Sequence, residues 1–133
     1  MIAVDTSAIL SVLFAEDDAE QMKAALAGDE NPVVSAPTYL GARIVLGGRI
    51  GILAQEKVDA FLASANVEVM EFNKGQATIA AAAWQRYGRG SGSPAKLNFG
   101  DCFSYALAQF LAVPLLYKGD DFSATDVTAA LSA

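Results

Sequence analysis

The sequence contains no histidine and a single cysteine, Cys102. The lack of histidine excludes histidine-based catalytic triads, histidine zinc sites and histidine general bases. One cysteine cannot form a disulfide within the chain, which favours a reducing compartment. Any chemistry that this chain performs must therefore use carboxylates, hydroxyls or basic side chains.

Long hydrophobic runs are also missing, although hydrophobic residues make up 53% of the 133 residues. No apolar run reaches the roughly 18 residues that a membrane span needs. The first residues, Met-Ile-Ala-Val-Asp, lack the basic start and the apolar stretch of a signal peptide. We expect a cytoplasmic protein that does not associate with membranes and folds as one domain over residues 1–133.

Basic residues are scarce: 9 Lys and Arg stand against 15 Asp and Glu, for a formal net charge of −6. This balance argues weakly against nonspecific nucleic-acid binding. A metal-dependent nuclease remains compatible with it, because a metal site concentrates carboxylates. Arg86, Arg89 and Lys96 cluster around one loop and are candidates for phosphate contacts, although solvated surface is the commoner role of such residues.

Short β-like runs alternate with longer helical runs along the chain, which predicts an α/β fold with a parallel sheet. Strands are expected at residues 2–4, 32–35, 67–72 and 114–117, with a weak last strand near 127–131. Helices are expected at 6–14, 17–27, 37–48, 53–65, 74–87 and 99–112, and the segment GRGSGSPAKLN at 88–98 predicts a loop. Thr6 and Ser7 are candidates for capping the first helix.

Carboxylates follow two of the expected strands. Asp5 ends the first strand, Asp120 and Asp121 come just after the fourth, and Asp101 lies in the first turn of the helix before it. Each has an ordinary structural role when taken alone, such as capping a helix or interacting with its dipole. If the first and fourth strands are neighbours, however, these groups meet at one edge of the sheet and repel unless a cation neutralises them. Oxygen ligands without His or Cys suit Mg²⁺ or Mn²⁺ better than zinc.

Three segments carry a resemblance to a known family: MIAVDTSAIL, VVSAPTYLGARIVL and LNFGDCFSYALAQFLAVPLLYKGDDFSATDV. Together they resemble the PIN-domain ribonucleases, in particular the VapC toxins of bacterial toxin–antitoxin pairs. The resemblance implies a PIN-like three-layer α/β/α sandwich with a five-stranded parallel sheet of order 3-2-1-4-5. It also implies a magnesium-dependent endoribonuclease, hence a hydrolase with an RNA substrate, as well as a VapB-like antitoxin partner, a toxin homodimer and a cytoplasmic bacterial setting.

The resemblance assigns metal ligands residue by residue. Asp5 matches the first acidic position and Asp101 the third, while the fourth falls on Asp120 or Asp121, and the sequence leaves open which of the two. The second position is a glutamate in a pattern like Tyr-Leu-Glu-Ala, but here it is Gly41. Glycine in a helix interior costs about 1 kcal/mol relative to alanine.

Three explanations are compatible with Gly41. The chain is a deliberately disabled variant, or Glu71 or another carboxylate compensates for the missing glutamate, or the chain is a naturally inactive relative that only binds partners. The sequence does not choose among them. A glycine that allows close helix packing agrees with all three.

Other residues have weaker assignments. Thr6, Ser7, Asn98 and Ser104 neighbour the expected ligands and are candidates for orienting them through hydrogen bonds, although caps and turns explain each equally well. The aromatic residues Trp84, Phe99, Phe103 and Phe110 are expected in the core. The antitoxin is expected to dock across residues 9–14 and 19–26.

Two rival functions remain. A phosphorelay receiver domain also combines clustered carboxylates with a lysine after a late strand, here Lys118, but VEVMEFN lacks the aspartate that a receiver needs at the end of its third strand. A non-catalytic PIN-like protein that binds an antitoxin would show antitoxin binding without metal-dependent RNA cleavage.

Overall fold

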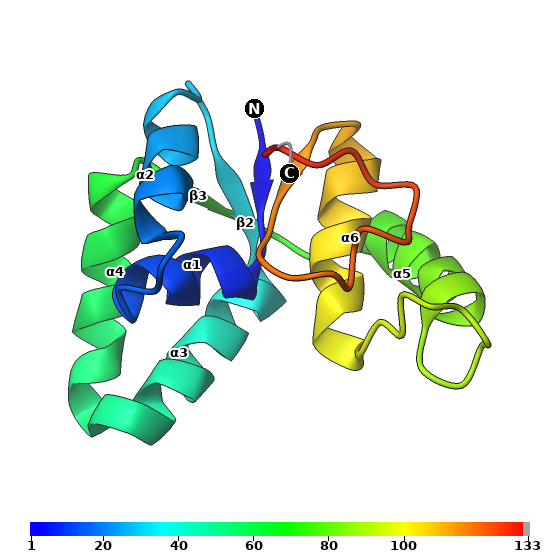
Figure 1. Ribbon diagram of the computed structural model, residues 1–133, viewed down its shortest axis with the longest axis horizontal. Coiled ribbons are helices and arrows are strands. Elements are labelled where there is room, and N and C mark those ends of the chain that lie inside the picture. The colour runs from blue at the N-terminus through cyan, green and yellow to red at the C-terminus, as the bar shows by residue number, and fades with distance from the viewer. Residues whose placement is uncertain (132–133) are drawn as a thin grey trace.

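The computed structural model describes residues 1–131 as alternating strands and helices around one sheet (Figure 1). The strands are β1 (Ala3–Val4), β2 (Val33–Ser35), β3 (Glu68–Met70) and β4 (Leu115–Leu116). The helices are α1 (Thr6–Leu13), α2 (Ala19–Ala27), α3 (Ala36–Ile50), α4 (Ala54–Ser64), α5 (Lys74–Tyr87) and α6 (Phe99–Leu111), with a 3₁₀ turn η1 (Gly51–Leu53) before α4.

The sheet is parallel and has four strands in the order β3-β2-β1-β4. The α/β class and the order of these four strands are as expected, but the fifth strand predicted near residues 127–131 is wrong. In its place the chain makes a single bridge beside β4, where the Leu115 N–H donates to Thr128 O and the Ala130 N–H donates to Leu115 O. The neighbouring alanines, Ala129 and Ala130, have low strand propensity, which is consistent with so short a contact.

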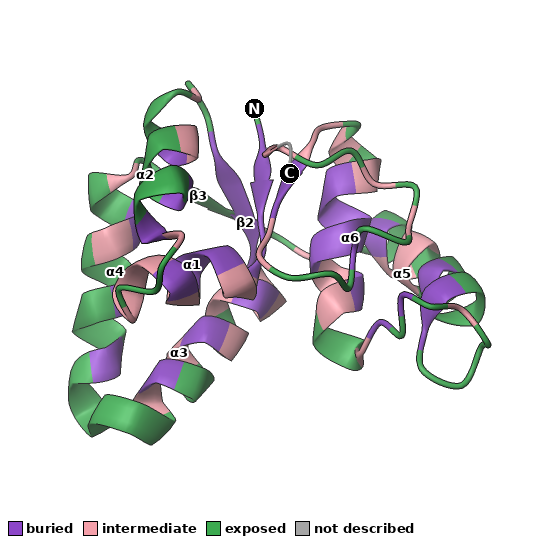
Figure 2. Cartoon of the chain, viewed as in Figure 1, coloured by how far each residue is buried: buried purple, intermediate pink, exposed green. Residues whose placement is uncertain are grey.

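Burial explains why the central strands form where they do. Every residue of β1, β2 and β4 is buried, whereas β3 at the sheet edge is mostly exposed (Figure 2). Short runs of Val, Leu and Ala without alternating polar residues are typical of parallel strands that are covered on both faces. In this fold the helices provide those covers.

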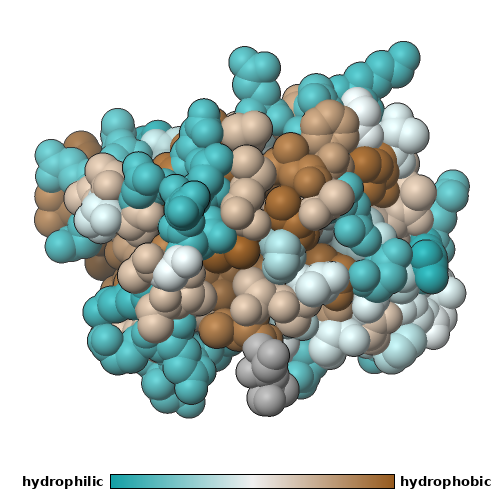
Figure 3. Space-filling model, turned by 90° about the horizontal axis from the view of Figure 1, so that it is seen from above, coloured by the Kyte–Doolittle hydropathy of each residue, from teal (hydrophilic) through white to brown (hydrophobic). Residues whose placement is uncertain are grey.

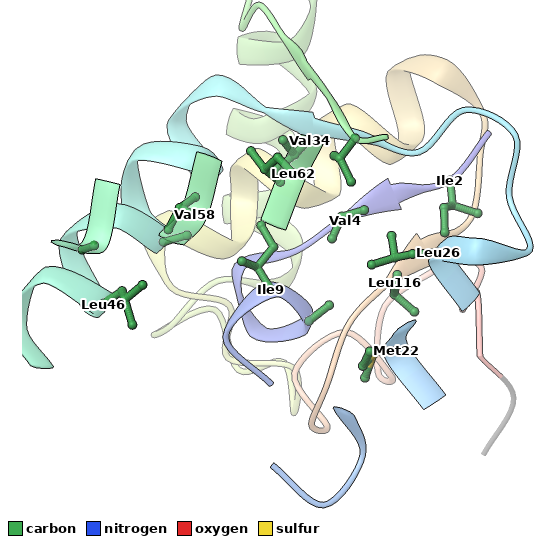
Figure 4. Packing of buried hydrophobic residues seen from close by; sticks show 14 residues of the cluster. Ile2, Val4, Ile9, Met22, Leu26, Val34, Leu46, Val58, Leu62 and Leu116 are labelled. Carbon is green, nitrogen blue, oxygen red and sulfur yellow. The ribbon is translucent and has the colours of Figure 1, made fainter. Parts of the chain in front are cut away.

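The two faces of the sheet carry separate hydrophobic clusters. One lies between the sheet and α1–α4 and includes Val4, Ile9, Val34, Val58 and Leu116 (Figure 4). The other lies between the sheet and the α5–α6 pair. Figure 1 shows this division, with α1–α4 on one side of the strands and α5 and α6 on the other. The result is three layers with the sheet in the middle.

Two helix boundaries differ from the predicted ones. Asp5, rather than Thr6 or Ser7, caps α1, because its side chain accepts a hydrogen bond from the Ser7 N–H. Helix α3 continues through Gly47 and Gly48 to Ile50 and ends at Gly51, whose φ of 73° is the left-handed conformation that glycine adopts readily. The glycine pair therefore does not end the helix.

Figure 3 shows the edge of the molecule at which the strands begin, with hydrophobic residues near the middle of this face and hydrophilic residues toward its rim. The carboxyl ends of the strands lie at the opposite edge, the lower one in Figure 1. Among residues 1–131, no helix is long and apolar enough to cross a bilayer.

Candidate functional site

The carboxyl edge of the sheet brings together segments that are far apart in the sequence. Helix α1 follows β1 directly, α3 follows β2, and α6 packs against α3 and against both strands (Figure 1). The pairing of Ala3 with Val33 and of Val4 with Leu116 sets the register of these strands. Asp5, one residue past β1, is therefore at the centre of this edge.

Asp5 is held rigidly. It is 6% exposed, and its Oδ2 accepts hydrogen bonds from the Ser7 N–H at 3.0 Å and the Ser7 hydroxyl at 2.7 Å, while its Oδ1 accepts one from the Ser104 hydroxyl at 2.6 Å. An ionised carboxylate has about four acceptor positions. Three are used here, so one position on Oδ1 remains for a further partner.

Thr38 completes this network and was missed by sequence reasoning. Its hydroxyl lies 3.2 Å from the Ser104 hydroxyl. Because Ser104 already donates to Asp5, the Thr38 hydroxyl acts as the donor in this pair. The Thr6 hydroxyl in turn donates to the Thr38 carbonyl oxygen at 3.3 Å. A signal was available, since Thr38 lies one helical turn before Gly41 on the same face of α3.

Asp101 lies in the first turn of α6, where it forms a capping box with Asn98. The Asn98 N–H donates to Asp101 Oδ2 at 3.0 Å, and the Asp101 N–H donates to Asn98 Oδ1 at 2.8 Å. Burial raises the pKa of Asp101 from 3.8 to about 6, with further upward contributions from the negative charges of Asp5 and Asp121, while Arg89 lowers it. Asp101 thus stabilises the start of α6 through the capping box, but its ionised form is destabilised by burial and by the neighbouring negative charges.

This destabilisation predicts a pH dependence of stability. Because the folded pKa of about 6 exceeds the ordinary aspartate value of 3.8, the stability contributed by protonated Asp101 is fully present below pH 3.8 and is lost as the pH rises through 6. We therefore compare the free energy of unfolding of Asp101→Asn with that of the parent in EDTA. Between pH 4 and pH 7.5 this difference should change by on the order of 1 kcal/mol in the direction that makes the variant relatively more stable, after allowance for solvent screening.

Urea denaturation of both proteins at a series of pH values measures this difference. Glu20→Gln, which removes an exposed carboxylate from α2, is the matched control and should show no comparable drift. Parallel stability curves for Asp101→Asn and the parent would show that Asp101 is not desolvated.

Gly41 faces the site. A Cβ built on Gly41 meets Thr6 Oγ1 at 3.6 Å, which is an ordinary van der Waals contact. A larger side chain at position 41 would therefore start beside the residue that follows Asp5 without displacing any neighbour. Glu71, the suggested substitute, is exposed after β3, which is separated from β1 by β2.

The turn after β4 separates the two candidate aspartates. Asp121 acts electrostatically on Asp101, and it lines a surface hollow of about 610 Å³ together with Arg89, Lys96 and the glycines of the 88–98 loop. Asp120 is exposed, and its carbonyl oxygen accepts hydrogen bonds from Ser123. Both side chains are exposed, but of the pair it is Asp121 whose charge contributes to the raised pKa of Asp101.

The three basic residues predicted to contact phosphate do not all lie near the acidic residues. Arg89 and Lys96 line the hollow beside Asp121. Arg86 instead pairs with Asp126 at 3.7 Å and stacks over the Tyr87 ring. The structure therefore places two of the three cations next to the carboxylates.

Lys118 does not have the position that a receiver domain requires. Its Nζ pairs with Glu16, Asp17 and Asp18 at 3.2–3.3 Å, and its backbone N–H donates to Ser7 Oγ. The lysine side chain is thus directed to the segment before α2 and not to Asp5.

The site fits a hard cation in ligand type but not in ligand number. The available groups are carboxylate and hydroxyl oxygens, which Mg²⁺ and Mn²⁺ prefer. Across residues 1–131, however, no group of three or more Asp, Glu or Cys side chains is arranged to hold a metal ion. Gly41, whose Cβ position lies 3.6 Å from Thr6 Oγ1, brings no ligand atom to this edge.

Three of the aromatic side chains predicted for the core are exposed. Phe99, Phe110 and Trp84, predicted to lie in the core, are 75%, 46% and 42% exposed. Only Phe103 is partly buried. The prediction that these residues lie in the core was therefore wrong for Phe99, Phe110 and Trp84.

Similar proteins are known. The sequence matches the PIN domain over residues 2–127. It is 42% identical to ribonuclease VapC42 of Mycobacterium tuberculosis over 127 residues, which cover 96% of this chain and 97% of that relative.

Solved structures have the same fold. Mycobacterium tuberculosis VapC20, a sarcin–ricin loop cleaving toxin, aligns with a TM-score of 0.75 and 21% identity over 96% of this chain and 97% of that one. A chain in a toxin–antitoxin complex from Klebsiella pneumoniae aligns with a TM-score of 0.71 and 18% identity over the full length of both chains.

Proposed function

Because the chain belongs to the VapC ribonucleases of the PIN-domain family, we propose that its acidic edge is the active site of a metal-dependent endoribonuclease toxin that a VapB-like antitoxin neutralises. The observation that carries this proposal is the desolvated Asp101 beside a rigidly held Asp5, with Gly41 facing the same space. PIN-domain VapC ribonucleases generally depend on divalent metal ions. Burial and the nearby charge of Asp5 disfavour the ionised form of Asp101, and a divalent cation would offset both effects.

Asp5 and Asp101 are the residues that would hold Mg²⁺ or Mn²⁺, and Asp121 is the further carboxylate that acts electrostatically on Asp101. When bound, such an ion lowers the pKa of a water molecule and neutralises charge on the scissile phosphate. Ser7 and Ser104 fix the Asp5 carboxylate through hydrogen bonds, so that its free acceptor position points in one direction. Asn98 does the same for Asp101.

Arg89 and Lys96 would bind the phosphates of RNA next to the scissile one. They line one hollow with Asp121, and phosphate contacts position a nucleic acid without reading its sequence. A local pair of cations is enough for this role in a chain whose net charge is −6. The same charge makes a basic antitoxin segment a complementary partner.

We propose a different surface for that antitoxin from the one expected from the sequence. Ile9, Met22 and Leu26, in the segments predicted for docking, are buried in the core. Large hydrophobic residues are exposed instead on α3 and η1: Leu40, Ile44, Val45, Ile50, Ile52 and Leu53. We place antitoxin docking on this α3–η1 surface, and we also propose a homodimer and a cytoplasmic location.

The antitoxin proposal predicts that Ile44→Asp and Ile52→Asp weaken capture of the VapB-like product of the adjacent gene by at least about tenfold, because a buried charge at the centre of an apolar interface is costly. Pull-down and calorimetric titration measure this. Ala82→Asp adds the same charge to exposed α5 and should bind normally. Equal capture by all variants would place docking elsewhere, and no capture by the parent would contradict the toxin assignment.

A second candidate function follows from Gly41: a PIN-domain protein that binds an antitoxin but does not cleave RNA. The shortage of metal ligands in residues 1–131 favours it. Expression of the chain without antitoxin distinguishes the two functions. An active toxin arrests growth and degrades cellular RNA, whereas a binding protein does neither.

A further inference from the structure

An apolar pocket lies on the α5–α6 side of the molecule. It has a volume of about 540 Å³ and is lined mainly by aromatic residues and alanines from the end of β3, α5 and the start of α6. Its rings are Phe72, Trp84, Phe99 and Phe103. A pocket of this size is in the range that holds small ligands.

The aromatic rings of this pocket form an ordered row. Phe103 makes edge-to-face contacts with Phe72 and Phe99, each with ring centroids 4.9 Å apart. Phe99 is nevertheless 75% exposed, although it is held by this contact. Its ring therefore offers a free face in a fixed position, as stacking of a flat ligand requires.

The pocket adjoins the proposed active site through α6. Asp101 and Ser104 lie one turn apart on the face of α6 that meets Asp5. Phe99 and Phe103 are also one turn apart on α6. Each is two residues from Asp101, and residues two apart do not share a helix face, so the two rings lie on a different face of α6 from Asp101. The acidic site is thus linked to the aromatic pocket through the first turns of α6, and to the hollow with Arg89 and Lys96 through Asp121.

This arrangement matches the chemistry of a single RNA strand. Unpaired bases bind proteins by stacking on aromatic side chains, while cations follow the phosphates. Gln85 at the pocket wall has both a donor and an acceptor for the edge of a base. A second copy of this chain would need a much larger surface than one pocket, of about 800 Å² per partner.

We propose that the pocket formed by Phe72, Trp84, Phe99 and Phe103 binds one unpaired nucleobase of the RNA, beside the acidic site, while Arg89 and Lys96 bind neighbouring phosphates. The proposal rests on the ribonuclease function proposed above and adds a site that selects single-stranded substrate. Trp84 is the only tryptophan of the chain and lines this pocket, so its fluorescence reports on occupancy directly.

The test measures binding rather than cleavage. Short single-stranded oligoribonucleotides are titrated in EDTA at low salt while Trp84 emission is followed, and an abasic oligomer of equal length and charge is compared with them. We expect base-containing RNA to quench Trp84 and to bind about tenfold more tightly than the abasic oligomer. Phe99→Ala should remove this advantage, whereas Phe99→Tyr should keep it.

Two controls separate the base from the backbone. Lys96→Ala should weaken both oligomers by the same factor, because it contacts phosphate. Phe110→Ala removes an aromatic ring that is 46% exposed near the end of α6 and outside the pocket, and it should change nothing. Since Phe99 is itself exposed, circular dichroism should show all these variants folded.

Three results overturn the proposal: equal binding of base-containing and abasic RNA, no binding of either, or Trp84 emission that changes with protein concentration in the absence of RNA. The last, together with a dimer in sedimentation that Phe99→Ala dissociates, would assign the pocket to a second copy of the chain. Cleavage of RNA by the Gly41→Glu form is independent of these outcomes. The nucleobase pocket and the ribonuclease function can therefore fail separately.

Discussion

Replacing Gly41 with glutamate should convert this chain into a markedly more active, metal-dependent ribonuclease. Gly41→Glu should cleave RNA at least about a hundredfold faster than the parent in Mg²⁺ or Mn²⁺, because loss of groups that merely orient a metal ligand already costs 10–100-fold. It should also arrest growth when expressed without antitoxin. Incubation of total cellular RNA with each form, with and without EDTA, measures the difference.

The structure explains why this substitution is tolerated. The added Cβ meets only Thr6 Oγ1, at 3.6 Å. Glutamate is a better helix former than glycine, and position 41 lies in the second turn of α3. Without metal, the new carboxylate joins Asp5 and Asp101 in mutual repulsion. The variant should thus gain stability on addition of Mn²⁺ by more than the parent does.

Gly41→Gln is the matched control, because it has nearly the same size and helix propensity but no charge. It should stay as inactive as the parent. If the parent cleaves RNA as fast as Gly41→Glu, position 41 is not a metal ligand. If Gly41→Gln gains activity equally, the side chain acts by packing and not by charge.

Asp5→Asn should nearly abolish Mn²⁺ binding. The Asp5 carboxylate is buried, and hydrogen bonds direct its one free acceptor position, so that its charge is the main attraction for a cation at this edge. We expect the affinity for Mn²⁺ to fall by at least about tenfold in the parent and further in the Gly41→Glu form. Titration followed by electron paramagnetic resonance measures the free ion directly.

Comparison with other carboxylates makes this result specific. Glu20→Gln removes the same charge from exposed α2 and should leave the affinity unchanged. Asp121→Asn should weaken binding more than Asp120→Asn, since Asp121 acts electrostatically on Asp101. Unchanged affinity in Asp5→Asn would place the metal elsewhere, and a larger effect of Asp120→Asn would reverse the assignment within this pair.

Some features of this protein are determined by local sequence. The apolar runs at residues 2–4 and 33–35 predict buried strands, because only a parallel sheet covers such runs on both faces. The helix at 74–87 was predicted with its observed boundaries, and in the structure the Asn73 side chain caps its start by accepting a hydrogen bond from the Gln76 N–H. Asp5 and Asp101 were candidates because they follow a strand and open a helix, positions that local patterns reveal.

The tertiary structure alone decided which of these groups meet. Thr38, Ser104 and Asp5 come from three distant segments, and their hydrogen bonds depend on the register of β1 with β2 and on the packing of α6 against both. The same holds for Phe99, which a helical pattern assigns to the core but which lies at the open end of α6, beyond the cover of any neighbouring element. Residues 127–131 do not form a strand, because strand pairing depends on the backbone groups of the neighbouring strand. On β4 only Leu115 exchanges backbone hydrogen bonds with this segment. Sequence patterns act over a few residues, whereas burial and contacts between distant segments are fixed only when the layers pack.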